Sequence, residues 1–169
     1  MIVLALLFLA GTWFLHPRHR LVSAFAKPED RARGFLSGVR NYFLSVLLLV
    51  VVFGAFNGFY ATVGWLALAW GDGAAGLIGG SESAKLPWSR KKPIVGLLAG
   101  ILGVFIAIIV ASCWSSASCA GLGTVRLVSF AALAIAIGLL ESLELPLDDN
   151  FTVGLSTPAL LLGLSALGV

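Results

Sequence analysis

Apolar runs of helix length alternate with short polar segments along the whole chain. The apolar runs cover residues 1–15, 42–56, 59–79, 93–113, 124–143 and 152–169. None of them alternates strictly between polar and apolar residues, which favours helices over the strands of a β-barrel. The pattern predicts an all-α fold, a polytopic transmembrane helical bundle of about six spans. The first run is short for a span.

Composition supports a membrane location. Hydrophobic residues make up 59% of the chain and charged residues 11%, and the mean hydropathy is +1.02, which ordinary soluble domains do not reach. The 20 glycines suit membrane helices, because small residues let helix backbones approach closely. No repeat or linker divides the sequence, so we expect one integral membrane domain over residues 1–169. The basic residues flank helices, which does not indicate nucleic-acid binding.

The positive charges indicate how the predicted spans are oriented. Ten of the 11 Lys and Arg residues lie in the first and third predicted loops, residues 16–41 and 80–92. The positive-inside rule places these loops and the fifth loop in the cytoplasm, with both termini outside. Arg126, at the start of the fifth span, is the exception. Segment 16–41 is either partly an amphipathic piece on the membrane surface or a plain loop whose charges set the topology.

Carboxylates are the first candidate functional groups. Those expected near the cytoplasmic face are Asp72, Glu141, Asp148 and Asp149. A carboxylate inside a membrane-length run costs a few kcal/mol and usually marks a site. Together these groups suit Mg²⁺, with Asn150 as a neutral oxygen ligand, and one of them suits a general base. The alternatives are a packing ion pair or proton relay for Asp72, contact with water for Glu141, and a helix N-cap for Asp148 or Asp149.

Cations follow the carboxylate Asp72 in the sequence. Lys85, Arg90, Lys91 and Lys92 lie beside a glycine-rich bend, and Pro93 opens the next apolar run. Cations next to a helix N-terminus suit the phosphates of a nucleotide. The alternative is that they anchor the chain to anionic lipid headgroups and set its topology. The GxxxxGK[ST] pattern of a P-loop is absent.

The chain has two cysteines, Cys113 and Cys119, in a loop of small residues. Their spacing allows a disulfide. We nevertheless expect two free thiols.

Several of these residues together carry a resemblance to a known family. The stretch WGDGAAGLIGG, the segment KLPWSRKKPIVG, and the later ESLELPLDDNFTV resemble the phytol kinase/dolichol kinase family of polyprenol kinases. That family includes CTP-dependent diacylglycerol kinase and is distantly similar to CDP-diacylglycerol synthases. The resemblance spans residues 65–158, and its KLPW segment is most similar to the phytol kinase branch. The positions that match its hallmarks are Gly71, Asp72, Gly79, Lys92, Gly96, Glu141, Asp149 and Asn150.

The resemblance implies a membrane lipid kinase with its active site on the cytoplasmic side. Such an enzyme transfers the γ-phosphoryl group of a nucleoside triphosphate, CTP or ATP, to a long-chain isoprenoid alcohol such as phytol or geranylgeraniol, with Mg²⁺ as cofactor. It implies Asp72 and Glu141 as catalytic residues and Asp72, Asp149 and Asn150 as metal ligands. Nucleotide and phosphate binding then falls to Lys85, Arg90, Lys91, Lys92 and Gly96.

Two alternatives remain open from the sequence, and the second belongs to another functional class. One is a CDP-lipid synthase, a cytidylyltransferase that acts on a phospholipid acid or a prenyl phosphate and releases pyrophosphate. The other is a small transporter or scaffold that uses Asp72 for ion coupling and binds no nucleotide. The expected partners are membrane lipids, a lipid alcohol and a nucleoside triphosphate, and a homodimer is an open possibility.

Overall fold

The protein is described here by a computed structural model that covers residues 2–14, 36–80, 84–143, 145 and 148–168. Within these ranges the regular structure is helical, apart from one isolated bridge between Lys85 and Pro93. The helices are α1 (Ile2–Phe14), α4 (Ser37–Val52), α5 (Gly58–Ala67), the π-helix η1 (Leu68–Asp72), α6 (Gly73–Ile78), α7 (Ile94–Ser115), α8 (Thr124–Ser142) and α9 (Asp149–Ala166). The all-α prediction is confirmed. Residues 16–35 of the segment 16–41, predicted as an amphipathic surface piece or a loop, lie outside the described residues. Its last five residues, 37–41, belong to α4, so the loop boundary predicted at 41 is wrong.

The number of membrane spans is supported only in part. Among the helices of the described ranges, α7 and α8 are long and apolar enough to cross a membrane, and α4 is apolar but shorter. The structure therefore gives two candidate spans where the sequence predicted about six. The predicted run 42–56 is also displaced: α4 begins at Ser37 and ends at Val52. After a short turn, Asn57 caps α5, its side chain accepting a hydrogen bond from the backbone N–H of Phe59 at 2.9 Å.

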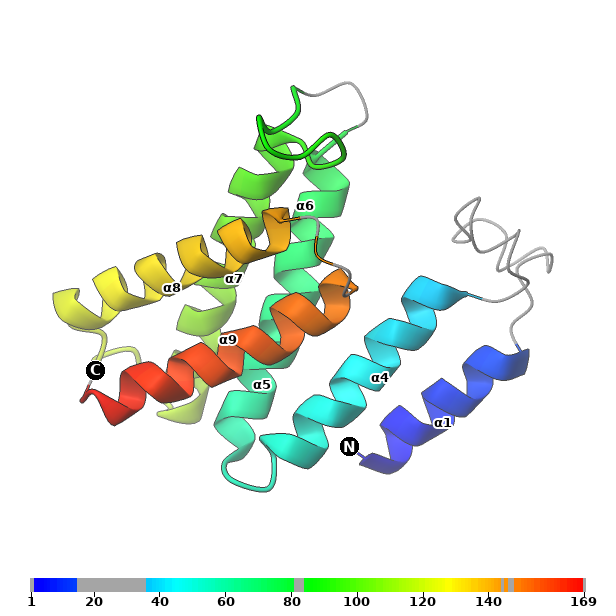
Figure 1. The fold of residues 1–169 in the computed structure, drawn as a ribbon. Helices are drawn as coiled ribbons and strands as arrows, with labels where there is room; N and C mark the ends of the chain where they lie inside the picture. Colours follow the sequence, from blue (N-terminus) through cyan, green and yellow to red (C-terminus); the bar gives the residue numbers. More distant parts are fainter. Residues whose placement is uncertain (1, 15–35, 81–83, 144, 146–147, 169) are drawn as a thin grey trace.

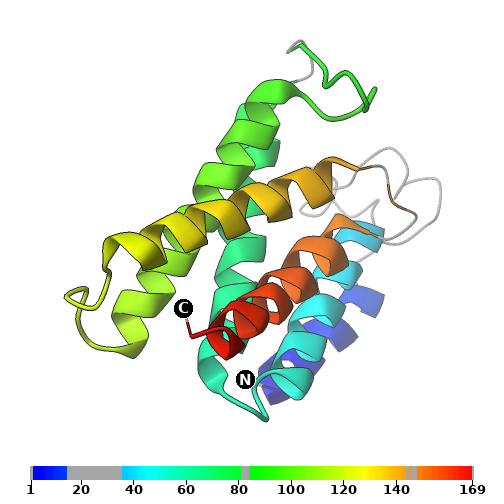
Figure 2. The same ribbon diagram turned by 60° about the vertical axis from the view of Figure 1, so that its left-hand side comes forward.

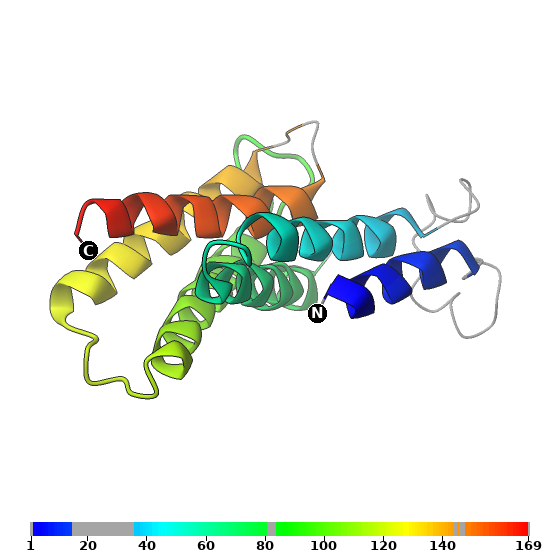
Figure 3. The ribbon, with the colours of Figure 1, turned by 90° about the horizontal axis from the view of Figure 1, so that it is seen from below.

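The helices run back and forth between two ends of the bundle (Figures 1 and 2). Helices α5, η1 and α6 follow one another directly and form one rod, which packs against α7. On its other side α7 packs against α8, whereas α9 lies across α5 and also contacts α4 and α8. Helix α1 lies along α4 at the edge of the bundle (Figure 3). The core is formed by Val63, Ala67, Val104, Ala107, Ile108, Ala134, Ile137 and Val153.

The two ends of the bundle carry different groups. The starts of α4, α7 and α9 and the ends of α6 and α8 lie at one end, which we call the Lys92 end (Figure 1). The α4–α5 turn, the α7–α8 connection and the end of α9 lie at the other, which we call the disulfide end. This alternation matches the order of charged and uncharged loops in the sequence.

Glycines allow the rod and α7 to touch backbone to backbone. A Cβ atom at Gly103 would lie 2.5 Å from the carbonyl oxygen of Trp70, and one at Gly71 would lie 2.6 Å from a methyl group of Val104. The contact falls on η1, where five-residue spacing interrupts the α-helical hydrogen bonding. Such π segments are rare and recur at functional sites. Asp72 is the last residue of η1.

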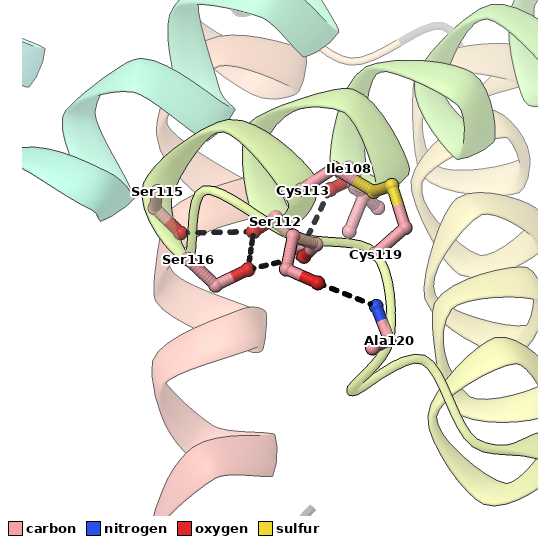
Figure 4. Close-up of a disulfide and its surroundings, with 8 residues drawn as sticks. Ile108, Ser112, Cys113, Ser115, Ser116, Cys119 and Ala120 are labelled. Carbon is pink, nitrogen blue, oxygen red and sulfur yellow. Dashed lines mark hydrogen bonds between the residues drawn. A yellow bond between two sulfur atoms is a disulfide. The ribbon is translucent and has the colours of Figure 1, made fainter.

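The expectation of two free thiols is wrong, because Cys113 and Cys119 form a disulfide (Figure 4). Cys113 lies in the last turns of α7, and the chain reverses directly after the helix, with Ala117 in the left-handed region at φ 51°. This reversal brings the two Cα atoms to 4.6 Å, within the range that a disulfide spans. Sequence spacing alone did not reveal the reversal.

The close approach of η1 and α7 predicts that an added methyl group destabilises the fold at Gly103 but not at Gly163. Gly103→Ala should destabilise the fold by about 1–3 kcal/mol, because the new Cβ meets the rigid backbone of Trp70. Thermal unfolding in detergent measures the effect. Gly163→Ala in α9 is the matched control, since nothing lies within 4 Å of a Cβ built there. Equal melting temperatures for the two variants would refute the backbone contact.

Candidate functional site

A pocket of about 330 Å³ opens at the Lys92 end, where four helices meet. Its polar lining comes from η1, the segment before α7, the end of α8 and the start of α9. The lining residues are Asp72, Ala75, Gly76, Lys91, Lys92, Pro93, Gly96, Leu97, Gly138, Glu141, Ser142 and Asp149. Three carboxylates and two ammonium groups therefore share one cavity with an apolar wall.

Lys92 links the two carboxylates on α8 and α9. Its Nζ donates hydrogen bonds to Asp149 Oδ2 at 2.6 Å and to Glu141 Oε1 at 3.2 Å. The Glu141 side chain is buried, with 8% of its surface exposed, whereas that of Asp149 is 43% exposed. Burial by itself lowers the pKa of Lys92, but the hydrogen bond that Lys92 donates to Asp149 and the charges of both carboxylates outweigh it, so the pKa is raised. Lys92 thus remains charged and offsets the cost of burying Glu141.

Local turns hold Lys92 in this position. The hydroxyl of Ser89 accepts hydrogen bonds from the backbone N–H groups of Lys91 and Lys92, at 3.3 and 3.1 Å. The indole N–H of Trp88 donates to Ser142 Oγ on α8 at 3.0 Å. These contacts attach residues 85–92, which we call the basic segment, to the end of α8. Trp88 and Ser89 were not among the predicted site residues, although a serine directly before basic residues is a signal for such a turn.

Asp149 is held by the cap of α9. Asp148 is the N-cap, and its side chain accepts from the backbone N–H of Asn150 at 3.0 Å and from the side-chain amide of Asn41 on α4 at 2.9 Å. Ser45 on α4 donates to the backbone carbonyl of Asn150 at 2.8 Å. The N-cap alternative is therefore confirmed for Asp148. It leaves Asp149 in the first turn of α9, where a carboxylate is favoured by the helix dipole.

The structure brings most of the predicted site residues together. Those that line the pocket are Asp72, Lys91, Lys92, Gly96, Glu141 and Asp149. Lys85 and Arg90 do not line it, and both are exposed to solvent. Asn150 does not line it either, because its side-chain amide is hydrogen-bonded to Asp148. Lys92 thus lines the pocket and Lys85 does not, although the sequence predicted phosphate binding for both.

Gly96 contributes by being small. A Cβ atom there would lie 3.0 Å from Pro93 Cγ and 3.1 Å from the carbonyl oxygen of Ala75. Helices α6 and α7 therefore cross closely beside the pocket, which brings Asp72 of the rod near the acidic end of α8.

The carboxylates of the pocket suit a hard cation, although the ammonium of Lys92 neutralises two of them. Mg²⁺ takes carboxylate oxygens together with phosphate oxygens, and Asp72, Glu141 and Asp149 supply the former. Across the described ranges no group of three or more His, Cys, Asp or Glu residues is arranged as a metal site. The ammonium of Lys92 lies between two of the three carboxylates, so a metal would compete with it.

Comparison with protein-family models, curated proteins and solved structures finds no match to this chain. The geometry of the pocket is therefore the basis for any functional proposal, together with the motif resemblance in the sequence.

The ion pairs predict how the fold responds to loss of Lys92. Lys92→Gln should destabilise the protein by about 1–3 kcal/mol, because Glu141 would stay buried beside Asp149 without a counter-charge. The double variant Lys92→Gln with Glu141→Gln should recover part of this loss. Chemical unfolding in detergent measures both. Lys91→Gln, which removes a neighbouring cation that forms no ion pair with a described carboxylate, is the control and should unfold like the unmodified chain.

The pH dependence of this contribution follows from the raised pKa of Lys92. A lysine whose pKa is higher in the folded than in the unfolded state contributes stability that is complete below the unfolded value, about 10.4. The contribution is lost as pH rises through the folded value. The stability difference between the unmodified chain and Lys92→Gln should therefore be unchanged between pH 7 and pH 9 and shrink above pH 10.4. A difference that already disappears by pH 9 would contradict the assignment.

Proposed function

We propose that this protein is a multi-pass membrane lipid kinase that transfers the γ-phosphoryl group of a nucleoside triphosphate, with CTP the expected donor, to the hydroxyl of a long-chain lipid alcohol. The observation that carries the proposal is the cluster of Lys92, Asp72, Glu141 and Asp149 in one pocket with an apolar wall. Phosphoryl transfer with Mg²⁺ needs both signs of charge at one place. The motif resemblance supports the same reading and makes an isoprenoid alcohol the expected acceptor.

Lys92 has a double role in this proposal. Without substrate its ammonium neutralises Glu141 and Asp149. When a nucleotide binds, the ammonium turns from the carboxylates to the phosphates, which would free Asp149 to hold Mg²⁺ together with Asp72 and leave Glu141 available to accept a proton. Asp72 and Asp149 are the proposed metal ligands, and the metal supplies charge neutralisation for the phosphate oxygens. The ion pairs of Lys92 thus neutralise the carboxylates and keep the site folded between turnovers.

The transfer step itself needs a base and an acceptor. The alcohol oxygen forms a bond to the γ-phosphorus as the bond from that phosphorus to the β–γ bridging oxygen breaks, and the nucleoside diphosphate leaves. The hydroxyl proton passes to a carboxylate, for which Glu141 is the proposed acceptor. Glu141 suits this role because its side chain is buried yet lines the pocket.

The apolar wall supports a lipid acceptor. Pro93, Leu97 and Gly138 line the pocket, and Leu77 on α6 and Leu98 on α7 are exposed at 87% and 61%. An alcohol at the end of a hydrocarbon chain fits this arrangement, since the chain remains in apolar surroundings while the hydroxyl reaches the charged groups.

The disulfide supports the proposed orientation. The Lys92 end carries the basic segment, which the positive-inside rule assigns to the cytoplasm. Cys113 and Cys119 lie at the opposite end and are paired, and disulfides persist in oxidising compartments outside the cytoplasm. Charge and redox chemistry therefore support the same orientation independently.

Phosphoryl transfer by the purified full chain in lipid tests the function. The assay supplies Mg²⁺, γ-labelled CTP or ATP, and a panel of phytol, geranylgeraniol, dolichol and diacylglycerol. We expect label on one of these lipids and a loss of at least about 100-fold in rate for Asp72→Asn, a change that removes one metal-ligand charge. No transfer with any acceptor, or full activity in Asp72→Asn, would refute the assignment. Release of labelled pyrophosphate on adding a phosphorylated lipid would favour the CDP-lipid synthase instead.

The pocket further predicts that two lysines of the basic segment differ. Lys92→Gln should lower kcat/KM for the nucleotide by about tenfold or more, because a charge-assisted contact to phosphate is lost. Lys85→Gln should change it by less than about threefold, since Lys85 does not line the pocket. Equal losses in both variants would mean that the segment acts through its net charge alone.

Orientation is testable without any substrate. In a background with Cys113→Ser and Cys119→Ser, single cysteines are introduced as Lys85→Cys or Ser118→Cys, one at each end of the bundle. A membrane-impermeant maleimide added to intact cells should label only the Ser118→Cys variant, and lysis should expose the other. Labelling of both cysteines before lysis would contradict a spanning bundle.

A further inference from the structure

Arg126 is a cation that is not part of the proposed kinase site. It lies in the first turn of α8, at the disulfide end, while the other ten Lys and Arg residues belong to the first and third loops. A cation in a first turn is disfavoured by the helix dipole. The two ion pairs of Lys92 lie at the other end of the bundle and do not involve Arg126. The guanidinium of Arg126 makes one long hydrogen bond, 3.5 Å from Nη1 to the carbonyl of Gly121.

Arg126 lines a second cavity, of about 270 Å³, which we call the Arg126 cavity. The end of α7, the start of α8, the start of α5 and the end of α9 enclose it. Its lining residues are Phe59, Ser112, Ser115, Ser116, Ser118, Gly121, Leu122, Arg126, Phe130, Leu161 and Ser165. One half is therefore apolar, with two aromatic rings, and the other half consists of hydroxyls and a guanidinium.

The hydroxyls of this cavity differ in what they offer a ligand. Ser112 and Ser116 donate to backbone carbonyls of the α7 end, as Figure 4 shows. Ser165 donates to Leu161. Ser118 instead accepts from the backbone N–H of Ala120 at 3.0 Å, which leaves its own O–H to donate. The disulfide between Cys113 and Cys119 closes the loop that carries Ser118.

We propose that the Arg126 cavity binds a phosphate group. The guanidinium offers several N–H donors in one plane, the geometry that suits phosphate, and the Ser118 hydroxyl adds a neutral donor. Among the described residues no carboxylate lines this cavity to repel an anion. Phe59, Phe130 and Leu122 provide an apolar surface for any hydrocarbon attached to the phosphate. The ligand is either a phospholipid headgroup or free phosphate, and the site is independent of the proposed kinase pocket.

Calorimetric titration of the full chain in detergent tests the site. The two probes are inorganic phosphate and dihexanoylphosphatidate below its micelle concentration. We expect saturable binding of at least one probe, weakened about tenfold or more by Arg126→Gln because a charge-assisted contact is lost. Binding of the lipid alone identifies a headgroup site, whereas binding of both identifies a phosphate site.

Two matched variants locate the effect. Arg40→Gln removes one positive charge at the opposite end of the bundle and should leave the affinity unchanged. Arg126→Lys keeps the charge but loses the planar set of donors, so its affinity should lie between those of the unmodified chain and Arg126→Gln; it also serves if the glutamine variant fails to fold. Because the kinase pocket also suits phosphate, Lys92→Gln is titrated as well. No binding of either probe, or binding that Lys92→Gln removes and Arg126→Gln leaves unchanged, would overturn the proposal.

Discussion

The ammonium of Lys92 is the group on which the acidic end of this bundle depends. Glu141 is buried at the end of α8, and an uncompensated carboxylate there would cost about 1–3 kcal/mol. Lys92 removes that cost and also reaches Asp149 at 2.6 Å, so one side chain joins the segment before α7 to the ends of two other helices. The surrounding hydrogen bonds serve this arrangement: Ser89 shapes the turn, Trp88 attaches it to Ser142, and the cap of α9 fixes Asp149.

The packing of the rod against α7 explains how a charged pocket is compatible with an apolar chain. The rod and α7 approach closely through Gly71 and Gly103, and Asp72, at the end of η1, lines the pocket beside this contact. Close backbone packing of this kind is typical of membrane helices, where small residues at the interface let backbones approach. Stability and site geometry therefore have a common origin, in which small residues bring the charges together and Lys92 balances them.

The opposite end of the bundle is organised differently. A disulfide, rather than an ion pair, closes the α7–α8 connection, and the cavity beside it holds one cation among serine hydroxyls. The two ends thus differ both in the interaction that holds their connections and in their charged groups. This difference between the two ends is consistent with the proposed orientation, because positive charge and disulfides are favoured on opposite sides of a membrane.

The sequence by itself determined the helical class, the positions of α7 and α8, and the residue types of the pocket. These are local properties: apolar runs of sufficient length predict helices, and a carboxylate in such a run is costly enough to be informative. Only the tertiary structure decided which groups meet. It separated Lys92 from Lys85, assigned Asp148 to a helix cap, and paired Cys113 with Cys119. Those outcomes depend on how the helices pack and on where the chain reverses after α7. Neither follows from spacing, because contacts between distant segments and a left-handed alanine leave no periodic pattern in the sequence.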